Sequence, residues 1–466
     1  MNPEGYDAVI RLFNIYYPTR ILILAVGEVL IVCTSFVLGA LLRLGEDSMS
    51  VLAYQHGFYK ILGVTAIVLL CLDYFDLYDS HRLPSSYETY FRLLVVLSLL
   101  SFLLAGIGIL FPGFMLGNQT FVFGLLILTL ALFGWRSIYA WVIRQPFLRE
   151  RVYVLGRGDR ANFLVDALRD RPELGMDVVG WSRSAGGDSP TREALAVDLL
   201  EKAKSRGVDR IIVTMGDRRG TMPVRELLEL RLRGIKVEDA AGLIEKITGK
   251  IEIGGLLPSW LIFSEGFRLN FWLFLIRRLS SIIVAVTLLV LLLPFIPLIA
   301  LAVKLSSPGP VFYRQTRVGR NGEIFTCCKF RTMLWNSEAE TGPAWAGSDD
   351  PRITRVGRWL RDTRLDEVPQ LWNVLRGDMG FVGPRPERPE FVEWLSREIP
   401  YYHLRHVIPP GITGWAQVCY RYGASLEESM EKLKYDLYYI KHMCLSLDLV
   451  VIFRSVKIVL LRRGAR

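Results

Sequence analysis

Residues 361–387 read RDTRLDEVPQLWNVLRGDMGFVGPRPE, and the rest of the chain is organised around this stretch. It contains two adjacent acids, Asp366 and Glu367, with arginines on both sides. A carboxylate can attack phosphorus or bind a metal ion, and guanidinium groups bind phosphate oxygens, so the pattern predicts chemistry on a phosphate group. A solvated helix face held by salt bridges is the alternative. The prolines and glycines after the acids favour a rigid, turn-rich site instead.

Two further segments accompany this stretch in a fixed order. Residues 309–333 read GPVFYRQTRVGRNGEIFTCCKFRTM, and residues 409–418 read PPGITGWAQV. With residues 364–387, they resemble the signature of the bacterial sugar transferases. These are the polyprenyl-phosphate glycosyl-1-phosphate transferases that begin capsule, O-antigen and exopolysaccharide synthesis. The resemblance covers the chain from about residue 277 onward, and the N-terminal part is similar to the large, multi-span branch of that family.

The composition indicates a membrane protein of mixed α and α/β class. Of the 466 residues, 51% are hydrophobic, and the mean hydropathy of +0.30 is high for a soluble enzyme of this length. The net charge of +10 fits arginines that flank membrane spans, or an anionic substrate or lipid surface. We expect no nucleic acid partner, because no basic-aromatic motif or reading helix is present. The cysteines form no CxxC pair and indicate a reducing, cytosolic context.

Apolar runs predict a four-helix transmembrane unit over residues 1–145. Arginines lie before the first run, between the second and third, and after the fourth, whereas the loop at 45–56 contains acids and no Lys or Arg. Positive-inside counting therefore places both ends of this unit in the cytoplasm. Glu28 interrupts the first run and is expected to act as a structural hydrogen-bonding group. The four runs are 21–42, 57–76, 93–111 and 114–135.

The middle of the chain, residues 146–265, alternates strand-like and helix-like patterns. Such alternation predicts a Rossmann-like module with a parallel sheet. Residues 151–168 read RVYVLGRGDRANFLVDAL, a strand, a glycine turn and a helix with the spacing G-x-G-x-x-A. The acid that would bind a ribose is missing after the second strand, where residues 181–183 read WSR. We therefore favour a structural, oligomerising or regulatory role over cofactor binding, and we expect a homodimer through this module.

A second apolar segment, residues 275–305, is expected to be a re-entrant membrane helix. Its length alone predicts a spanning helix, and a kinked fifth span stays open as the alternative. Pro294 and Pro297, however, lie past its middle, where proline breaks a helix. Basic residues flank both ends of the apolar run. If the segment crossed the bilayer, the domain after it would face away from the cytoplasm, where nucleotide sugars are made.

Residues 306–466 are predicted to form a small α/β catalytic domain with interfacial C-terminal helices. The Asn321-Gly322 pair predicts a β-hairpin turn. The far end of the hairpin would present Lys329 and Arg331 on one face, either to phosphate or to solvent.

A helix over residues 354–364 would place Arg361 and Arg364 on one face. The acids that follow would project about 100° apart on a helix, which favours separate roles for them. Residues 435–462 have helical spacing and either lie at the membrane interface or pack onto the catalytic core. Asp436 and Asp448 in this region are expected to form structural salt bridges.

The family resemblance implies a two-step reaction. A UDP-sugar binds with Mg²⁺, Asp366 attacks the sugar-bearing phosphorus and releases UMP, and undecaprenyl phosphate then attacks the sugar-phosphoryl-aspartate. Glu367 is expected to bind the Mg²⁺, with a base role as the alternative. The expected phosphate ligands are Arg385, Arg361, Lys329 and Arg331.

The apolar runs and the family resemblance together predict a multi-pass protein of the bacterial inner membrane. Its catalytic domain would lie on the cytoplasmic face, beside the membrane lipids. An NAD-dependent sugar-nucleotide epimerase built on the middle module would need a Tyr-x-x-x-Lys pair, and none follows the module before the next apolar segment. A non-catalytic scaffold for polysaccharide assembly would leave the acid pair and the Pro-Arg-Pro motif unexplained. A fragment that begins near Arg277 is expected to retain activity. The sequence does not name the sugar.

Overall fold

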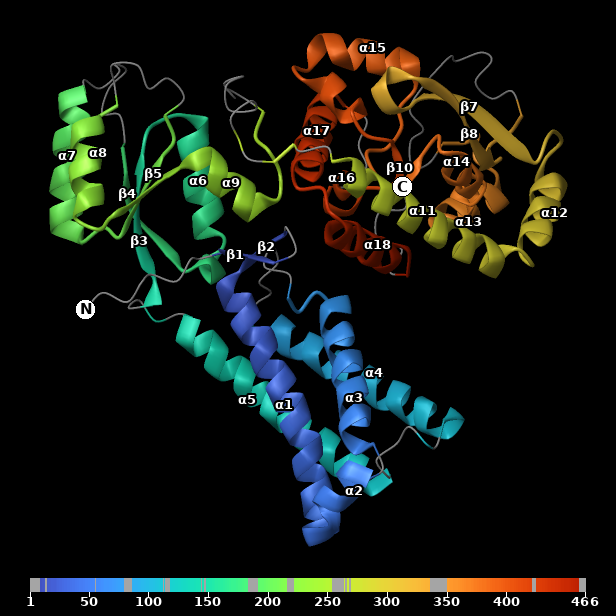
Figure 1. Ribbon diagram of the computed structural model, residues 1–466, viewed down its shortest axis with the longest axis horizontal. Helices are drawn as coiled ribbons and strands as arrows, with labels where there is room; N and C mark the ends of the chain where they lie inside the picture. Colours follow the sequence, from blue (N-terminus) through green and yellow to red (C-terminus); the bar gives the residue numbers. More distant parts are fainter. Residues whose placement is uncertain are drawn as a thin grey trace. The chain divides into compact units, whose positions relative to one another are not determined.

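The computed structural model describes most of the chain, and its internal contacts divide it into two units (Figure 1). One unit comprises residues 1–10 and 16–243, and the other comprises residues 11–15 and 244–466. The described residues are 9–12, 15–54, 56–78, 86–111, 113, 118–143, 145, 148–182, 192–215, 222–253, 264, 266–267, 270–335, 350–420 and 425–460.

Long apolar helices form the membrane part of the first unit. Each predicted span is confirmed as a helix, although residues 114–117 of the fourth lie outside the described residues. Among the described residues five helices are long and apolar enough to cross a membrane, and the fifth, Phe271–Leu292, belongs to the second unit. The loop after α1 also contains short helical turns, which the sequence did not predict because seven residues are too few to show a helical period. The elements are β1 (Val9–Leu12), β2 (Ile15–Pro18), α1 (Thr19–Leu44), η1 (Gly45–Asp47), α2 (Ser48–Tyr54), α3 (Gly57–Tyr74), α4 (Ser86–Leu110) and α5 (Asn118–Ile143).

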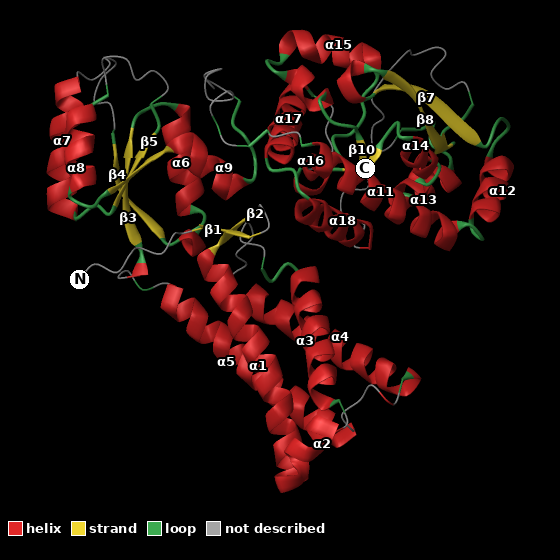
Figure 2. Ribbon diagram, in the orientation of Figure 1, coloured by secondary structure: helices red, strands yellow, loops and turns green. Residues whose placement is uncertain are grey.

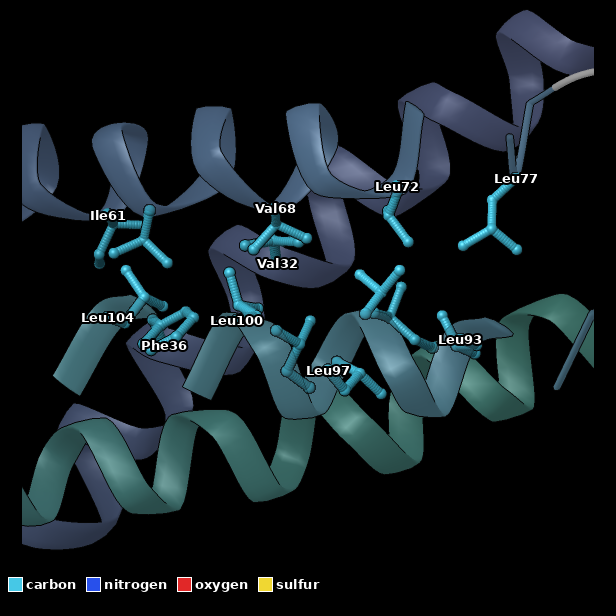
Figure 3. Close-up of a cluster of buried hydrophobic side chains, with 14 of the residues drawn as sticks. Val32, Phe36, Ile61, Val68, Leu72, Leu77, Leu93, Leu97, Leu100 and Leu104 are labelled. Atoms are coloured by element: carbon cyan, nitrogen blue, oxygen red, sulfur yellow. The ribbon is translucent and has the colours of Figure 1, made fainter. Parts of the chain in front are cut away.

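Aliphatic and aromatic side chains fill the space between these helices (Figure 3). Val32 and Phe36 of α1, Val68 of α3 and Leu100 of α4 are fully buried in this cluster. Helices in lipid associate through close packing, because the surrounding chains are as apolar as the helix faces. Gly39 of α1 permits such packing, since a Cβ at this position would lie 2.7 Å from the backbone nitrogen of Gly124 on α5.

A buried ion pair joins α1 to α5 inside the bundle. Nε of Arg136 donates to a carboxylate oxygen of Glu28 at 2.6 Å, and the hydroxyl of Tyr78 donates to the other oxygen. Arg136 also donates to the carbonyl of Leu77 at 2.9 Å. The structural role expected for Glu28 is therefore confirmed, because its charge is paired where an unpaired charge would be costly.

The parallel sheet predicted for the middle module is present (Figure 2). Its described strands pair in parallel and follow the order β4-β3-β5-β6, so the connection from β4 to β5 passes over β3. Gly156 directly follows β3 and has φ +134°, and a Cβ there would collide with the hydroxyl of Thr214. Close packing thus explains this glycine without a nucleotide. The elements are β3 (Glu150–Leu155), α6 (Asp159–Arg169), η5 (Pro172–Leu174), β4 (Met176–Trp181), α7 (Arg192–Arg206), β5 (Arg210–Val213), α8 (Val224–Leu232) and β6 (Lys236–Asp239).

The second unit contains the three sequence segments that define the candidate site. The predicted hairpin is confirmed: β7 and β8 pair antiparallel, and its turn uses Asn321 at φ +55° and Gly322 at φ +84°. Short strands β9 and β10 pair in parallel. The elements are α9 (Ala240–Thr248), α11 (Phe271–Leu292), α12 (Ile296–Ser306), β7 (Phe312–Val318), η6 (Arg320–Gly322), β8 (Ile324–Phe330), α13 (Arg355–Asp362), η7 (Leu365–Glu367), α14 (Gln370–Arg376), β9 (Gly380–Val382), α15 (Pro389–Glu398), η8 (Tyr402–His406), β10 (Gly411–Thr413), α16 (Trp415–Cys419), α17 (Leu426–Lys441) and α18 (Leu445–Leu460).

The helix predicted over 354–364 is shorter than expected. It begins where the Thr354 hydroxyl accepts a hydrogen bond from the Gly357 amide, and it ends at Asp362. Arg364 has φ +58°, so it lies in the left-handed region and cannot continue the helix. The prediction that Arg361 and Arg364 share a helix face is therefore wrong. The C-terminal helical region is likewise divided into α17 and α18, with a break between Lys441 and Leu445.

Removing one member of the buried pair in the bundle is expected to be costly. Glu28→Leu leaves Arg136 buried without its carboxylate, so we expect a loss of about 3–5 kcal/mol in the free energy of unfolding. Unfolding by SDS titration in mixed micelles measures this loss. The double variant Glu28→Leu/Arg136→Leu should recover most of it.

An exposed ion pair on the same bundle provides the matched control. Glu88→Leu removes the i,i+4 partner of Arg92 on α4 and should cost less than about 1 kcal/mol. An equal loss in both single variants, or no recovery in the double variant, would contradict a specific role for the buried pair.

Candidate active site

The two adjacent acids lie on a short 3₁₀ turn, η7, between α13 and α14. The left-handed conformation of Arg364 turns the chain, and the amide of Glu367 donates to its carbonyl at 3.2 Å. Asp366 is 8% exposed and Glu367 is 7% exposed. Both carboxyl groups are thus withdrawn from water, where an ionised form needs charged or hydrogen-bonded partners.

Glu367 has its partners from two distant parts of the chain. Its Oε1 accepts from Nζ of Lys329, at the end of β8, at 2.8 Å. The same oxygen accepts from both terminal nitrogens of Arg385 at 3.3 Å. Burial opposes ionisation of Glu367, but the charges of Lys329 and Arg385 outweigh it and hold the pKa of the carboxyl well below its ordinary value.

Asp366 is in the opposite electrostatic situation. Burial, and then the adjacent charge of Glu367, raise the pKa of its carboxyl, although Lys329 and the nearby arginines oppose this shift. Its Oδ1 is buried and has no hydrogen-bond partner among the residues that the structure describes. Neighbouring acids whose pKa values are pushed apart are typical of sites where each acid has its own role.

Arg361 also lies close to the acid pair. Its Nε donates to the hydroxyl of Thr332 at 2.9 Å, and its positive charge lowers the pKa of Asp366.

Arg331 has a different environment from Lys329. Lys329 contacts Glu367 whereas Arg331 contacts the end of α12, so the shared face predicted for the two side chains is not present. The Arg331 side chain is 3% exposed and donates to the carbonyls of Val303 at 3.3 Å and Ser307 at 2.7 Å. Its contacts therefore lie at the end of α12, and its role in phosphate binding stays a prediction.

The Pro384-Arg385-Pro386 turn is held through its backbone carbonyls. The amide of Gly411 donates to the Pro384 carbonyl at 2.9 Å, and Arg405 donates to the Arg385 carbonyl at 3.0 Å. Arg317 donates to the third carbonyl, that of Pro386, at 2.9 Å. These contacts fix the backbone from which Arg385 extends to Glu367.

Ion pairs between distant parts of the chain support this turn. The sequence predicted the acid of each pair but not its basic partner. Asp436 forms an ion pair with the buried Arg405, with 2.9 Å between the charged atoms, and Asp448 accepts from Nε of Arg277 at 2.8 Å. The structural salt bridges expected for both acids are confirmed. Their partners were missed, because no local spacing relates residues so far apart in the chain.

The apolar segment before the hairpin consists of two helices with both ends against the catalytic domain. The break between α11 and α12 is at residues 293–295 and contains Pro294, and Pro297 is in the first turn of α12. Arg277, near the start of α11, donates to the carbonyl of Val382 at 2.9 Å. At the other end, the α12 carboxyl terminus accepts from Arg331.

The acid pair is the place where a divalent cation would fit. Among the described residues, no group of three or more His, Cys, Asp and Glu side chains could hold a metal ion. Mg²⁺, however, commonly takes one or two protein carboxylates, with substrate phosphates and water completing its coordination. Asp366 and Glu367 fit this pattern, since Oδ1 of Asp366 is without a partner.

Comparisons with known proteins assign the family. The sequence profile of the bacterial sugar transferases matches residues 272–462. The UDP-glucose:undecaprenyl-phosphate glucose-1-phosphate transferase of Escherichia coli (strain K12) is 34% identical over 68% of this chain and 69% of its own length. The chain belongs to the bacterial sugar transferase family. The Klebsiella pneumoniae protein of the same name is 32% identical to this sugar transferase, over 85% of the chain and 88% of the relative.

Relatives of the sugar transferase differ in the sugar that their names give. The UDP-N-acetylgalactosamine-undecaprenyl-phosphate N-acetylgalactosaminephosphotransferase of Aeromonas hydrophila is 40% identical over 52% of this chain. The matched stretch spans 56% of that relative's length.

Proposed function

We propose that this sugar transferase moves a sugar 1-phosphate from a UDP-sugar to undecaprenyl phosphate and releases UMP. This would be the first membrane step in the synthesis of an exopolysaccharide, capsule or O-antigen. The observation that carries the proposal is the convergence of the buried acid pair with Lys329 and Arg385. The names of the relatives support the class of donor and acceptor.

In the first step, the carboxylate of Asp366 attacks the sugar-bearing phosphorus. The phosphoanhydride bond breaks, UMP leaves with the electron pair, and a sugar-phosphoryl-aspartate forms. In the second step, a phosphate oxygen of undecaprenyl phosphate attacks the same phosphorus and the Asp366 carboxylate leaves. The unpartnered Oδ1 and the raised pKa of Asp366 support this role, because an ionised group of higher pKa is the better nucleophile.

The surrounding cations would bind the donor's phosphates. Arg385 and Arg361 are placed beside the acid pair, and guanidinium groups suit phosphate oxygens. Lys329 would provide a further contact to the phosphates. Phosphate binding by Arg331, at the end of α12, stays a prediction. Glu367 would hold Mg²⁺, which when bound neutralises charge on the diphosphate.

We also propose that α11 and α12 form a re-entrant hairpin in the inner leaflet. α12 has 11 residues, about 16 Å at 1.5 Å per residue, which is roughly half of a hydrocarbon core of about 30 Å. Ala285 of α11 and Val303 of α12 are buried in one cluster with Phe330 and Leu360. Both arms thus return to the catalytic domain, which would lie on the cytoplasmic face of the inner membrane. The homodimer through the middle module stays a prediction.

A single-turnover experiment tests the nucleophile. Without undecaprenyl phosphate, wild-type protein with Mg²⁺ and a sugar-labelled UDP-sugar should release UMP and retain the label covalently. Asp366→Asn should reduce UMP release by roughly 10³-fold or more and retain no label. A panel of UDP-sugars names the donor in the same assay.

Asp362→Asn is the matched control. It changes the acid at the end of α13, shortly before η7, and should behave as wild type. Unchanged UMP release by Asp366→Asn would remove Asp366 as the nucleophile.

The pH dependence of UMP release tests the electrostatics of the pair. Asp366 must be ionised to attack, so the rate should fall as the pH drops below its raised pKa. Lys329 lowers that pKa, and Lys329→Gln should therefore move the acid limb of the pH–rate profile to higher pH. Lys329→Arg keeps the charge and should leave the limb in place. A limb that moves to lower pH in Lys329→Gln would contradict this arrangement.

Cysteine labelling in intact cells tests the re-entrant topology. Glu323→Cys, in the hairpin after α12, should react with a membrane-impermeant maleimide only after the cells are permeabilised. Asp47→Cys, in the loop after α1, should react in intact cells, and the wild type supplies the background from native cysteines. Labelling of Glu323→Cys in intact cells would show that the segment crosses the bilayer.

A further inference from the structure

A short segment outside the family match is built into the catalytic unit. Residues 244–253, here named the strap, comprise the end of α9 and the extended chain after it. They belong to the second unit, although α9 begins in the first. Ile251 is 1% exposed and Ile253 is 6% exposed. The strap is therefore part of the packed structure of this unit.

Complementary charges hold the strap to α17. Lys250 pairs with Glu431 of that helix, and Glu252 accepts from Nζ of Lys434 at 2.6 Å. Between them, the amide of Ile251 donates to the backbone carbonyl of Lys434 at 3.0 Å. A positive and a negative side chain thus follow each other on the strap, and the opposite charges face them on α17. This pattern fixes how the strap residues align with the helix.

The start of the strap binds the other end of α17. Glu245 is 4% exposed and accepts from Nζ of Lys441 at 2.7 Å. Its second oxygen lies 2.5 Å from Nε2 of His442. The strap therefore follows α17 from Glu431 to His442.

A glycine joins the strap to α16. The carbonyl of Gly249 accepts from the indole nitrogen of Trp415 at 2.8 Å. Gly249 has φ +65°, and a Cβ there would lie 3.2 Å from the indole ring. Both the backbone conformation and the close ring favour glycine at this position.

The two helices that bind the strap also hold the Pro-Arg-Pro turn. On α17, Asp436 pairs with Arg405, which donates to the carbonyl of Arg385. α16 directly follows β10, whose Gly411 amide donates to the carbonyl of Pro384. Two routes thus lead from the strap to the backbone that carries Arg385.

We propose that the strap is a positioning element for Arg385. By holding α16 and α17, it fixes the turn that directs the Arg385 guanidinium toward Glu367 and the donor's phosphate. A displacement of about 1 Å at such a group can cost about 10²-fold in rate. The inference rests on the proposed function and extends the catalytic unit from about residue 277 back to residue 244. A fragment that begins near Arg277 lacks this support, so the proposal predicts lower activity for it than the sequence alone suggested.

Strap variants of the full-length protein test the proposal by UMP release. Lys250→Ala/Glu252→Ala removes the charges that face α17 and should lower kcat/KM about tenfold or more, mainly through a raised KM for the UDP-sugar. Lys250→Arg/Glu252→Asp should restore most of the activity. Arg397→Ala, which removes an exposed ion pair on α15, is the control and should retain wild-type activity. Strap variants with wild-type kcat/KM would overturn the proposal.

A double-mutant cycle separates positioning from general stability. In an Arg385→Lys background, the Lys250→Ala/Glu252→Ala change should cost much less than in the wild type, because the positioned group is already altered. The same fold-loss in both backgrounds would overturn the proposal. If the alanine variant is not recovered folded, Trp415→Phe removes the donor to Gly249 while keeping an aromatic ring at this position, and it enters the same cycle. A wild type that releases no UMP from any UDP-sugar would instead contradict the proposed function.

Discussion

The paired burial of Glu367 with Lys329 and Arg385 is the constraint on which the catalytic unit depends. A carboxylate with 7% exposure is stable as an anion only if cations reach it, and these two come from the hairpin and the Pro-Arg-Pro turn. Three distant segments must therefore meet at one point. Asp366 differs from its neighbour, because its buried Oδ1 has no hydrogen-bond partner among the described residues.

The same rule of paired charges connects the membrane segment to the site. Arg277 is buried near the start of α11 and binds both Asp448 and the Val382 carbonyl. Val382 ends β9, immediately before the turn that carries Arg385. The Arg277 guanidinium thus joins the start of α11, the C-terminal helix α18 and strand β9, which leads into the site. The position of α11 and the geometry of the turn that carries Arg385 are in this way set together.

Local sequence signals predicted the regular elements well. The Asn321-Gly322 turn, the parallel strands of the middle module and the membrane runs follow from turn chemistry and hydrophobic period. The end of α13 was missed because Arg364 adopts a left-handed conformation that arginine disfavours alone and that the surrounding structure imposes. The partners of Asp436 and Asp448 were missed for another reason. Ion pairs between distant segments leave no periodic trace in the sequence.

By itself, the sequence determined the family, the membrane character, the acid pair and the order of the elements, because these depend on motifs and on residue periodicity. The tertiary structure alone decided that Lys329 turns to Glu367 while Arg331 turns to the end of α12. It also decided that residues 244–253 pack with α16 and α17 rather than serving as a linker. Such choices depend on which buried charges find partners after the chain has folded, and that is a property of three-dimensional packing.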